Sequence, residues 1–233
     1  MSGTDWIPVS MAPSSPAATP TTVVSAVKRG RRRFYAYRRT TNLAQKTALA
    51  LAFAALTGIA AQIRVPLPFS PVPVTGQTFA VLLCGIALGR EFGGLSQGLY
   101  AAIGAAGVPW FSGLSGGIGV VLGPTGGYLL GFVIAAATVG WVTDRWVSSR
   151  RYRRLIVVLA VANFGIIHVL GMAGLAVWMT VSTGSAPSLS AVVTAGSLPF
   201  IPGDVVKLLA AAAVGTTILP KQPSQPSASA DDT

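Results

Sequence analysis

Charged residues are scarce in this chain. Asp, Glu, Lys and Arg make up only 10% of its 233 residues, whereas soluble domains carry about 25%. Hydrophobic residues make up 52%, and the mean hydropathy is +0.63. This composition excludes an ordinary soluble domain and predicts an all-α integral membrane protein.

Cysteine, histidine and acidic residues are also rare, with one Cys, one His and six Asp and Glu residues. The lone Cys84 excludes a disulfide framework and a cysteine-based metal site. No Gly-x-x-x-x-Gly-Lys-Ser/Thr motif occurs, so the chain has no P-loop with which to hydrolyse ATP. We therefore expect no cofactor and no bound metal.

Basic residues are the exception, and they give a formal net charge of +11. One cluster, Lys28 to Arg39, precedes the first long apolar segment, and another, Arg150 to Arg154, lies between two later ones. Basic residues beside membrane spans mark the cytoplasmic side. This distribution favours a membrane protein over a nucleic-acid-binding protein.

The two ends of the chain differ from its middle. Residues 1–42 combine Pro, Ser and Thr clusters with the basic run, and residues 221–233 are rich in Ser and Pro. Both ends offer too little apolar surface to offset the entropy of ordering. We predict a disordered basic cytoplasmic tail, a transmembrane domain over residues 43–220, and a disordered C-terminal tail.

Apolar segments of about 20 residues are long enough to cross a bilayer as helices. Six such spans are predicted, of which the second and third are short: Leu43–Ile63, Thr75–Leu88, Gly93–Val108, Val120–Val142, Leu155–Val181 and Pro202–Leu219.

The basic residues orient these spans in the plasma membrane. With the N-terminus inside, 15 of the 17 Lys and Arg residues lie on the cytoplasmic side. Only Arg64, on the external side, and Lys207, within the sixth span, do not fit this orientation. We therefore predict six transmembrane helices with both termini in the cytoplasm.

Asp204 and Lys207 are two charges inside one predicted span. Their i, i+3 spacing places both side chains on one helical face. A charge at the centre of a membrane helix costs roughly 2.5–3.5 kcal/mol on insertion scales. The two charges must therefore pair, face a polar cavity, or do both, and such charges indicate a binding site.

Proline and glycine mark two segments on the external side. Four prolines keep residues 65–74 extended rather than helical, which fits either a lid or a simple connector. Seven glycines crowd the segment from Phe111 to Tyr128. They permit either close helix packing or close approach of a ligand to the backbone.

Neutral polar residues also lie in or near the spans: Gln77, Thr78, Gln97, Tyr100, Thr125, Tyr128 and Asn163. Each fits an interhelical hydrogen bond as well as a ligand contact. Trp110, Phe111 and Tyr128 fit either interfacial anchors or the walls of a pocket.

The first span carries a face of small residues, Ala44, Ala48 and Ala52. Small residues allow another helix to come close. The face therefore fits internal packing or a partner subunit within the membrane.

Ser115 and His168 raise an alternative function. Residues 113–116 (Gly-Leu-Ser-Gly) and 168–171 (His-Val-Leu-Gly) resemble motifs of rhomboid intramembrane serine proteases, in which the imidazole activates the hydroxyl. The predicted topology argues against an enzyme, because Ser115 falls at the external end of one span while His168 lies about 20 Å from the inner end of the next. We expect no catalytic residue and interpret His168 as a hydrogen-bonded packing residue.

Three motifs together resemble the BioY family, the biotin-binding membrane subunit (S component) of energy-coupling-factor vitamin importers. These motifs are PVPVTGQTF, GPTGGY and PGDVVK, in this order, within Ala60–Phe132 and Leu198–Ala212. The resemblance implies a six-helix S-component fold, high-affinity biotin binding and uptake, and an externally open pocket that the first loop closes. The first 42 residues lie outside it.

The resemblance also implies partners. They are a membrane coupling subunit, which would dock on the face of Ala44, Ala48 and Ala52, and two cytoplasmic ATPase subunits that supply the energy. It places Asp204 and Lys207 at the pocket.

The chemistry of biotin, a monocarboxylate, fits these residues. The Lys207 ammonium suits the carboxylate, and Asp204 either offsets Lys207 in the empty pocket or accepts from the ureido N–H groups. Other groups that we expect at the site are polar (Gln77, Thr125 and the backbone of Gly116 and Gly117) or form its walls (Trp110, Phe111 and Tyr128).

Overall fold

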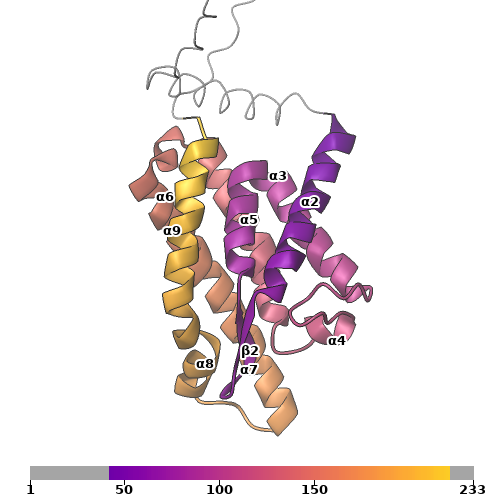
Figure 1. Ribbon diagram of the computed structural model, residues 1–233. Helices are drawn as coiled ribbons and strands as arrows, with labels where there is room; N and C mark the ends of the chain where they lie inside the picture. Colours follow the sequence, from indigo (N-terminus) through magenta and orange to yellow (C-terminus); the bar gives the residue numbers. More distant parts are fainter. Residues whose placement is uncertain (1–41, 221–233) are drawn as a thin grey trace, which may run out of the picture.

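The computed structural model describes residues 42–220. The predicted tails, residues 1–42 and 221–233, lie outside this range except for Asn42. Its side chain accepts a hydrogen bond from the backbone N–H of Gln45 at 2.9 Å and so caps helix α2 (Leu43–Gln62), as asparagine commonly does at a helix start. Figure 1 shows a bundle of helices with a β-hairpin near its lower end.

After α2, the elements follow in chain order: β1 (Arg64–Leu67), β2 (Ser70–Thr75), α3 (Gln77–Ala105), α4 (Ile118–Val121), α5 (Gly126–Arg145), the 3-10 turn η1 (Val147–Arg150), α6 (Tyr152–Ala160), the π-helical segment η2 (Val161–His168), α7 (Val169–Thr183), α8 (Leu189–Gly196), the 3-10 turn η3 (Leu198–Phe200) and α9 (Ile201–Ile218).

Within residues 42–220, five helical segments are long and apolar enough to cross a membrane: Leu43–Gln62, Gln77–Ala105, Gly126–Arg145, Tyr152–Thr183 and Leu189–Ile218. The sequence predicts six spans. The difference lies in α3, which contains both of the short spans that the sequence analysis separates.

Helix α3 is folded back on itself at Gly89. This residue has φ 80° and ψ −170° inside the helix. The side-chain amide of Gln77 donates to the Tyr100 hydroxyl at 2.9 Å although the residues are 23 positions apart. A straight helix would separate them by about 34 Å, so the two halves of α3 must lie side by side.

Helix α5 packs against both α3 and η2, and glycines allow the close approach. A Cβ atom at Gly85 would lie 2.5 Å from the carbonyl oxygen of Ala136, and one at Gly131 would lie 2.9 Å from the Cα of Ile167. Both distances are too short for a real side chain. These small residues therefore set the spacing of the bundle.

The two ends of the bundle differ in charge. The start of α2, η1 and the end of α9 lie at the upper end in Figure 1. Two contacts connect elements there: Lys46 Nζ lies 5.7 Å from the centre of the Phe92 ring, and Arg150 donates to the carbonyl of Pro220 at 3.0 Å. Seven of the nine Lys and Arg residues in the described range belong to the segments at this end.

The proline-rich segment forms an antiparallel hairpin of β1 and β2. The prediction that it is extended is confirmed, whereas an all-helical description omits this small sheet. Its register shifts between Val65 and Leu67, around Pro66, which has no N–H to donate. The Ser70 hydroxyl donates to the carbonyl of Ala195 at 2.6 Å, so the turn of the hairpin is attached to α8.

Replacing Gly89 with Ala should lower the thermal unfolding midpoint of the purified protein in detergent. The backbone angles of Gly89 are accessible chiefly to glycine, and such strain costs about 1–3 kcal/mol. Gly98→Ala is the matched control in the same helix, because a Cβ there meets open space. Equal midpoints for the two variants would contradict a chain reversal that depends on Gly89.

Candidate functional site

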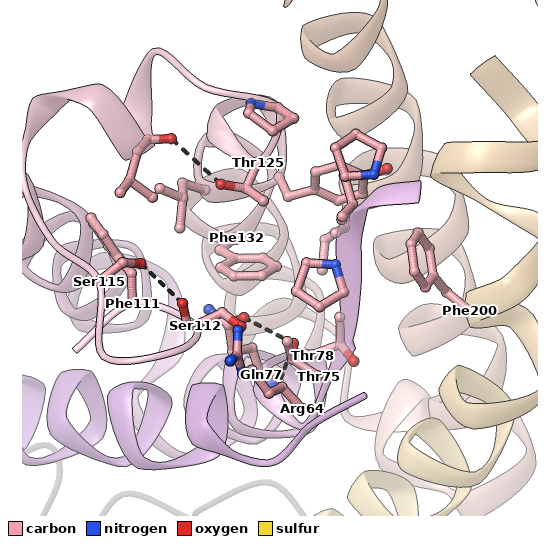
Figure 2. Close-up of a pocket in the computed structure, with 18 of the residues that line it drawn as sticks. Arg64, Thr75, Gln77, Thr78, Phe111, Ser112, Ser115, Thr125, Phe132 and Phe200 are labelled. Carbon is pink, nitrogen blue, oxygen red and sulfur yellow. Dashed lines mark hydrogen bonds between the residues drawn. The ribbon is translucent and has the colours of Figure 1, made fainter. Parts of the chain in front are cut away.

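A cavity of about 400 Å³ lies beside the hairpin. This volume suits a small organic molecule, since ligand pockets measure roughly 300–1,000 Å³. Its lining comes from distant segments of the chain: β1, β2, the start of α3, residues 111–125, α5, the end of η2, η3 and the start of α9. Figure 2 shows many of these side chains converging on it.

Asp204 and Lys207 both line this cavity. The Lys207 ammonium lies 2.5 Å from Oδ1 of Asp204 and donates to the carbonyl of Thr75 at 2.8 Å. Asp204 is only 3% exposed. Of the alternatives open for two intramembrane charges, the structure therefore has both: the charges pair, and they face a cavity.

Three further donors surround the Asp204 carboxylate. The Thr78 hydroxyl donates to Oδ1 at 3.1 Å, the Asn163 amide donates to Oδ2 at 3.0 Å, and Nε2 of His168 lies 2.7 Å from Oδ2. Together with Lys207 they occupy about four lone-pair sites, which is the capacity of a carboxylate. The protein itself thus satisfies this buried charge.

Both ring nitrogens of His168 are engaged. Its Nδ1 lies 2.8 Å from the Ser197 hydroxyl, and its Nε2 lies 2.7 Å from Oδ2 of Asp204. The Ser115 hydroxyl donates instead to the carbonyl of Ser112 at 2.9 Å. Although Ser115 and His168 both line the cavity, they form no nucleophile–base pair, and the protease alternative is not supported.

Asn163 and His168 reach one carboxylate because η2 is π-helical. Residues five apart on an α-helix lie about 140° apart around the axis. The i→i+5 hydrogen bonds of a π-helix accommodate an extra residue in the turn, and such segments often occur at functional sites. The sequence predicts neither contact, because α-helical periodicity does not bring Asn163 and His168 to the same side of the helix.

Gln77 provides a second polar group of the cavity, at the start of α3. It donates to the Tyr100 hydroxyl, and its carbonyl accepts from the Thr75 hydroxyl at 2.8 Å. Thr125 lines the opposite side in Figure 2. The structure therefore places both of these predicted polar residues at the cavity.

Aromatic rings form much of the apolar wall. Phe111 and Tyr128 line the cavity as the sequence analysis expects, and Phe132 and Phe200 join them. The Tyr128 hydroxyl donates to the carbonyl of Gly196 at 2.5 Å, so its ring faces the cavity while its polar end is satisfied by the chain before α9.

Three predicted residues are not among those that line the cavity: Trp110, Gly116 and Gly117. The Trp110 indole N–H donates to the carbonyl of Tyr100 at 3.0 Å, which holds the ring against α3. The backbone N–H of Gly117 donates to the carbonyl of Gly104 at 2.7 Å. These residues fix residues 106–117 against the second half of α3, and the geometry does not bring them to the site.

Arg64 lines the cavity as well. From the sequence alone, Arg64 is only an exception to the charge pattern. Its position at the start of β1, which is paired with Thr75 of β2, brings it to the site. The sequence does not place Arg64 at the cavity, because the proline content predicts an extended segment but not the pairing of β1 with β2.

Apolar helices long enough to span a bilayer, arranged around a polar-lined cavity, define a multi-pass integral membrane protein with an internal cavity of small-molecule size. The sequence profile of the BioY family matches residues 31–224. The chain belongs to the BioY family, and the resemblance found in the sequence is confirmed.

Relatives and a solved structure agree with this assignment. A probable biotin transporter BioY of Methanothermobacter thermautotrophicus is 46% identical over 141 residues, which cover 60% of this chain and 90% of the relative. The biotin transporter BioY of Thermotoga maritima is 35% identical over 162 residues, covering 70% and 88%. The fold is similar to that of the S-component for biotin from an ECF-type ABC transporter, with a TM-score of 0.65, 22% identity, and coverage of 74% and 89%.

A fluorophosphonate probe should leave Ser115 unlabelled in the purified protein. A serine reacts with such probes when a base activates its hydroxyl, and both nitrogens of His168 are bonded to other groups. Mass spectrometry of the probe-treated chain checks this, with an active serine hydrolase in the same reaction as a positive control. Stoichiometric modification of Ser115 would restore the enzyme hypothesis.

Proposed function

We propose that this protein binds biotin with high affinity and takes it up across the plasma membrane as the substrate-specific subunit of an ATP-driven vitamin importer. The observation that carries the proposal is the buried ion pair of Asp204 and Lys207 in the wall of a ligand-sized cavity. Membership of a family whose relatives are biotin transporters supports the choice of solute.

The lining of the cavity suits the parts of biotin. The ureido ring needs hydrogen-bond donors and acceptors, which Gln77, Thr78 and the Asp204–Lys207 pair offer. The thiophene ring and the alkyl chain need apolar walls, which Phe111, Tyr128 and the neighbouring aromatic rings provide. Thr125 adds a hydroxyl on the far side of the cavity.

The proposed topology has six crossings with both termini in the cytoplasm. The two halves of α3 supply two of these crossings, and the reversal at Gly89 lies at the basic end of the bundle. Seven of nine described Lys and Arg residues belong to that end, and basic residues favour the cytoplasmic side. The hairpin and the cavity then face the exterior, from which a vitamin arrives.

The hairpin is the proposed lid. Pro71, Val72 and Pro73 of β2 line the cavity, and Val72 is only 6% exposed. The hydrogen bond from Ser70 to Ala195 holds the hairpin against α8. In this position the strand covers one side of the cavity.

Helix α2 presents the proposed docking face for a membrane coupling subunit. Ala44, Ala48 and Ala52 are exposed, whereas Ala50 and Ala54 are buried inside the bundle. The exposed small side chains leave room for a partner helix to approach closely. Two cytoplasmic ATPase subunits would supply the energy, since this chain has no P-loop.

Lys207→Ala should weaken biotin binding at least tenfold in calorimetric titrations of the purified protein. The substitution removes the partner of a buried carboxylate at the cavity. Removing one member of a buried pair typically costs about 3–5 kcal/mol. Lys46→Ala, at the opposite end of the bundle, is the matched control.

A wild-type chain that binds lipoate as tightly as biotin would contradict the proposed selectivity.

Ala48→Trp should abolish biotin uptake by cells that contain the partner subunits, while biotin binding to the purified protein stays unchanged. The bulky ring would prevent close helix contact on the exposed face of α2 but lies far from the cavity. Val157→Trp is the control, because Val157 is a 61% exposed residue at a similar distance from the start of its own helix, α6. Normal uptake by the Ala48 variant would exclude this docking face.

A further inference from the structure

Arg64 is a second cation of the cavity, separate from the Asp204 network. It lines the cavity from the first residue of β1, and its side chain is exposed. Within residues 42–220, no hydrogen bond or ion pair engages its guanidinium. A charge that lines a cavity without a partner is available to a ligand.

The charge balance of the cavity points to this residue. Its charged lining consists of Arg64, Lys207 and Asp204, so two positive charges and one negative charge leave a surplus of +1 when His168 is neutral. Lys207 lies 2.5 Å from Asp204 and is therefore already compensated. The surplus resides on Arg64, and it matches the single negative charge of a monocarboxylate.

The position of the guanidinium is defined by the loop beneath it. Gly113 has φ +76°, and a Cβ there would lie 2.8 Å from Cζ of Arg64. The guanidinium thus rests directly on the backbone of Gly113, where a larger residue would displace it. Figure 2 shows Arg64 beside Ser112 at the cavity.

The hydroxyl of Ser112 is the second independent sign of a ligand group here. This oxygen is buried and has no hydrogen-bond partner in the part of the chain that the structure describes. Buried polar groups in proteins are nearly always paired. Ser112 lines the cavity next to Gly113, so a ligand oxygen near Arg64 would satisfy it.

We propose that Arg64 and Ser112 bind the carboxylate of biotin, so that the ureido ring points toward Asp204 and Lys207. A guanidinium presents its N–H groups in a fork that matches a carboxylate, and the serine hydroxyl adds a further donor. The inference rests on the proposed function and specifies the orientation of the ligand. It assigns the carboxylate to the hairpin and residues 112–113 rather than to the ammonium of Lys207.

The test compares biotin with biotinamide, in which a neutral amide replaces the carboxylate, by calorimetry on the full chain in detergent. The wild-type protein should bind biotin at least tenfold more tightly than biotinamide. In Arg64→Gln this ratio should fall to within about threefold of unity, because biotin loses its counterion while the neutral analogue does not. Ser112→Ala should reduce the same ratio in part.

Two controls separate this role from others. Arg153→Gln removes an exposed positive charge at the opposite end of the bundle and should keep the wild-type ratio. Lys207→Ala should weaken both ligands alike and also keep the ratio. If the ratio instead persists in Arg64→Gln and collapses in Lys207→Ala, the carboxylate binds Lys207 and the inference is overturned. Equal weakening of both ligands in Arg64→Gln would also overturn it.

A measurement on the wild-type chain does not depend on how the variants fold. Phenylglyoxal modifies accessible guanidinium groups, and mass spectrometry locates the modified residues. Biotin should protect Arg64 at least fivefold more than biotinamide does when both ligands are saturating, whereas Arg153 should react equally with either ligand. Equal protection of Arg64 by both ligands would contradict the inference. A wild-type chain that binds no biotin would overturn the proposed function itself.

Discussion

A carboxylate buried among membrane helices must be compensated by the protein, and Asp204 organises the structure around that need. Its donors come from the start of α3, from η2 and from the next turn of α9. Removing one partner of a buried charge destabilises the folded protein by about 3–5 kcal/mol. Each donor therefore helps to keep its own helix in place beside the cavity. The same network that stabilises the bundle thereby shapes the site.

The structure places the polar cavity and the exposed small residues of α2 on different parts of the bundle. The polar groups lie in a cavity beside the hairpin, whereas the exposed alanines of α2 begin near the basic end of the bundle. Substrate selection requires hydrogen bonds and charge at fixed positions. Contact with another membrane helix requires only small side chains. One bundle can therefore present both surfaces without either interfering with the other.

Local rules predicted the parts of the site that depend on local geometry. The i, i+3 spacing of Asp204 and Lys207 predicted that both charges share one helical face and must pair, face a polar cavity, or do both, and the four prolines predicted an extended segment. Three features needed tertiary information: the π-helical winding that joins Asn163 to His168, the strand pairing that brings Arg64 to the cavity, and the indole hydrogen bond that turns Trp110 away. The sequence predicts six spans, whereas the structure has five long helical segments in the described range. The counts differ because α3 is continuous except for the backbone angles of Gly89, which divide it into two antiparallel halves.

The hydrogen bond from Lys207 to the backbone of Thr75 has a mechanical consequence. Thr75 ends β2, which lines the cavity, so one ammonium group is shared between the charge network and the hairpin. Lys207 therefore connects the Asp204 carboxylate to the end of β2. The position of the strand and the position of the ammonium thus depend on each other, and a change in one alters the other.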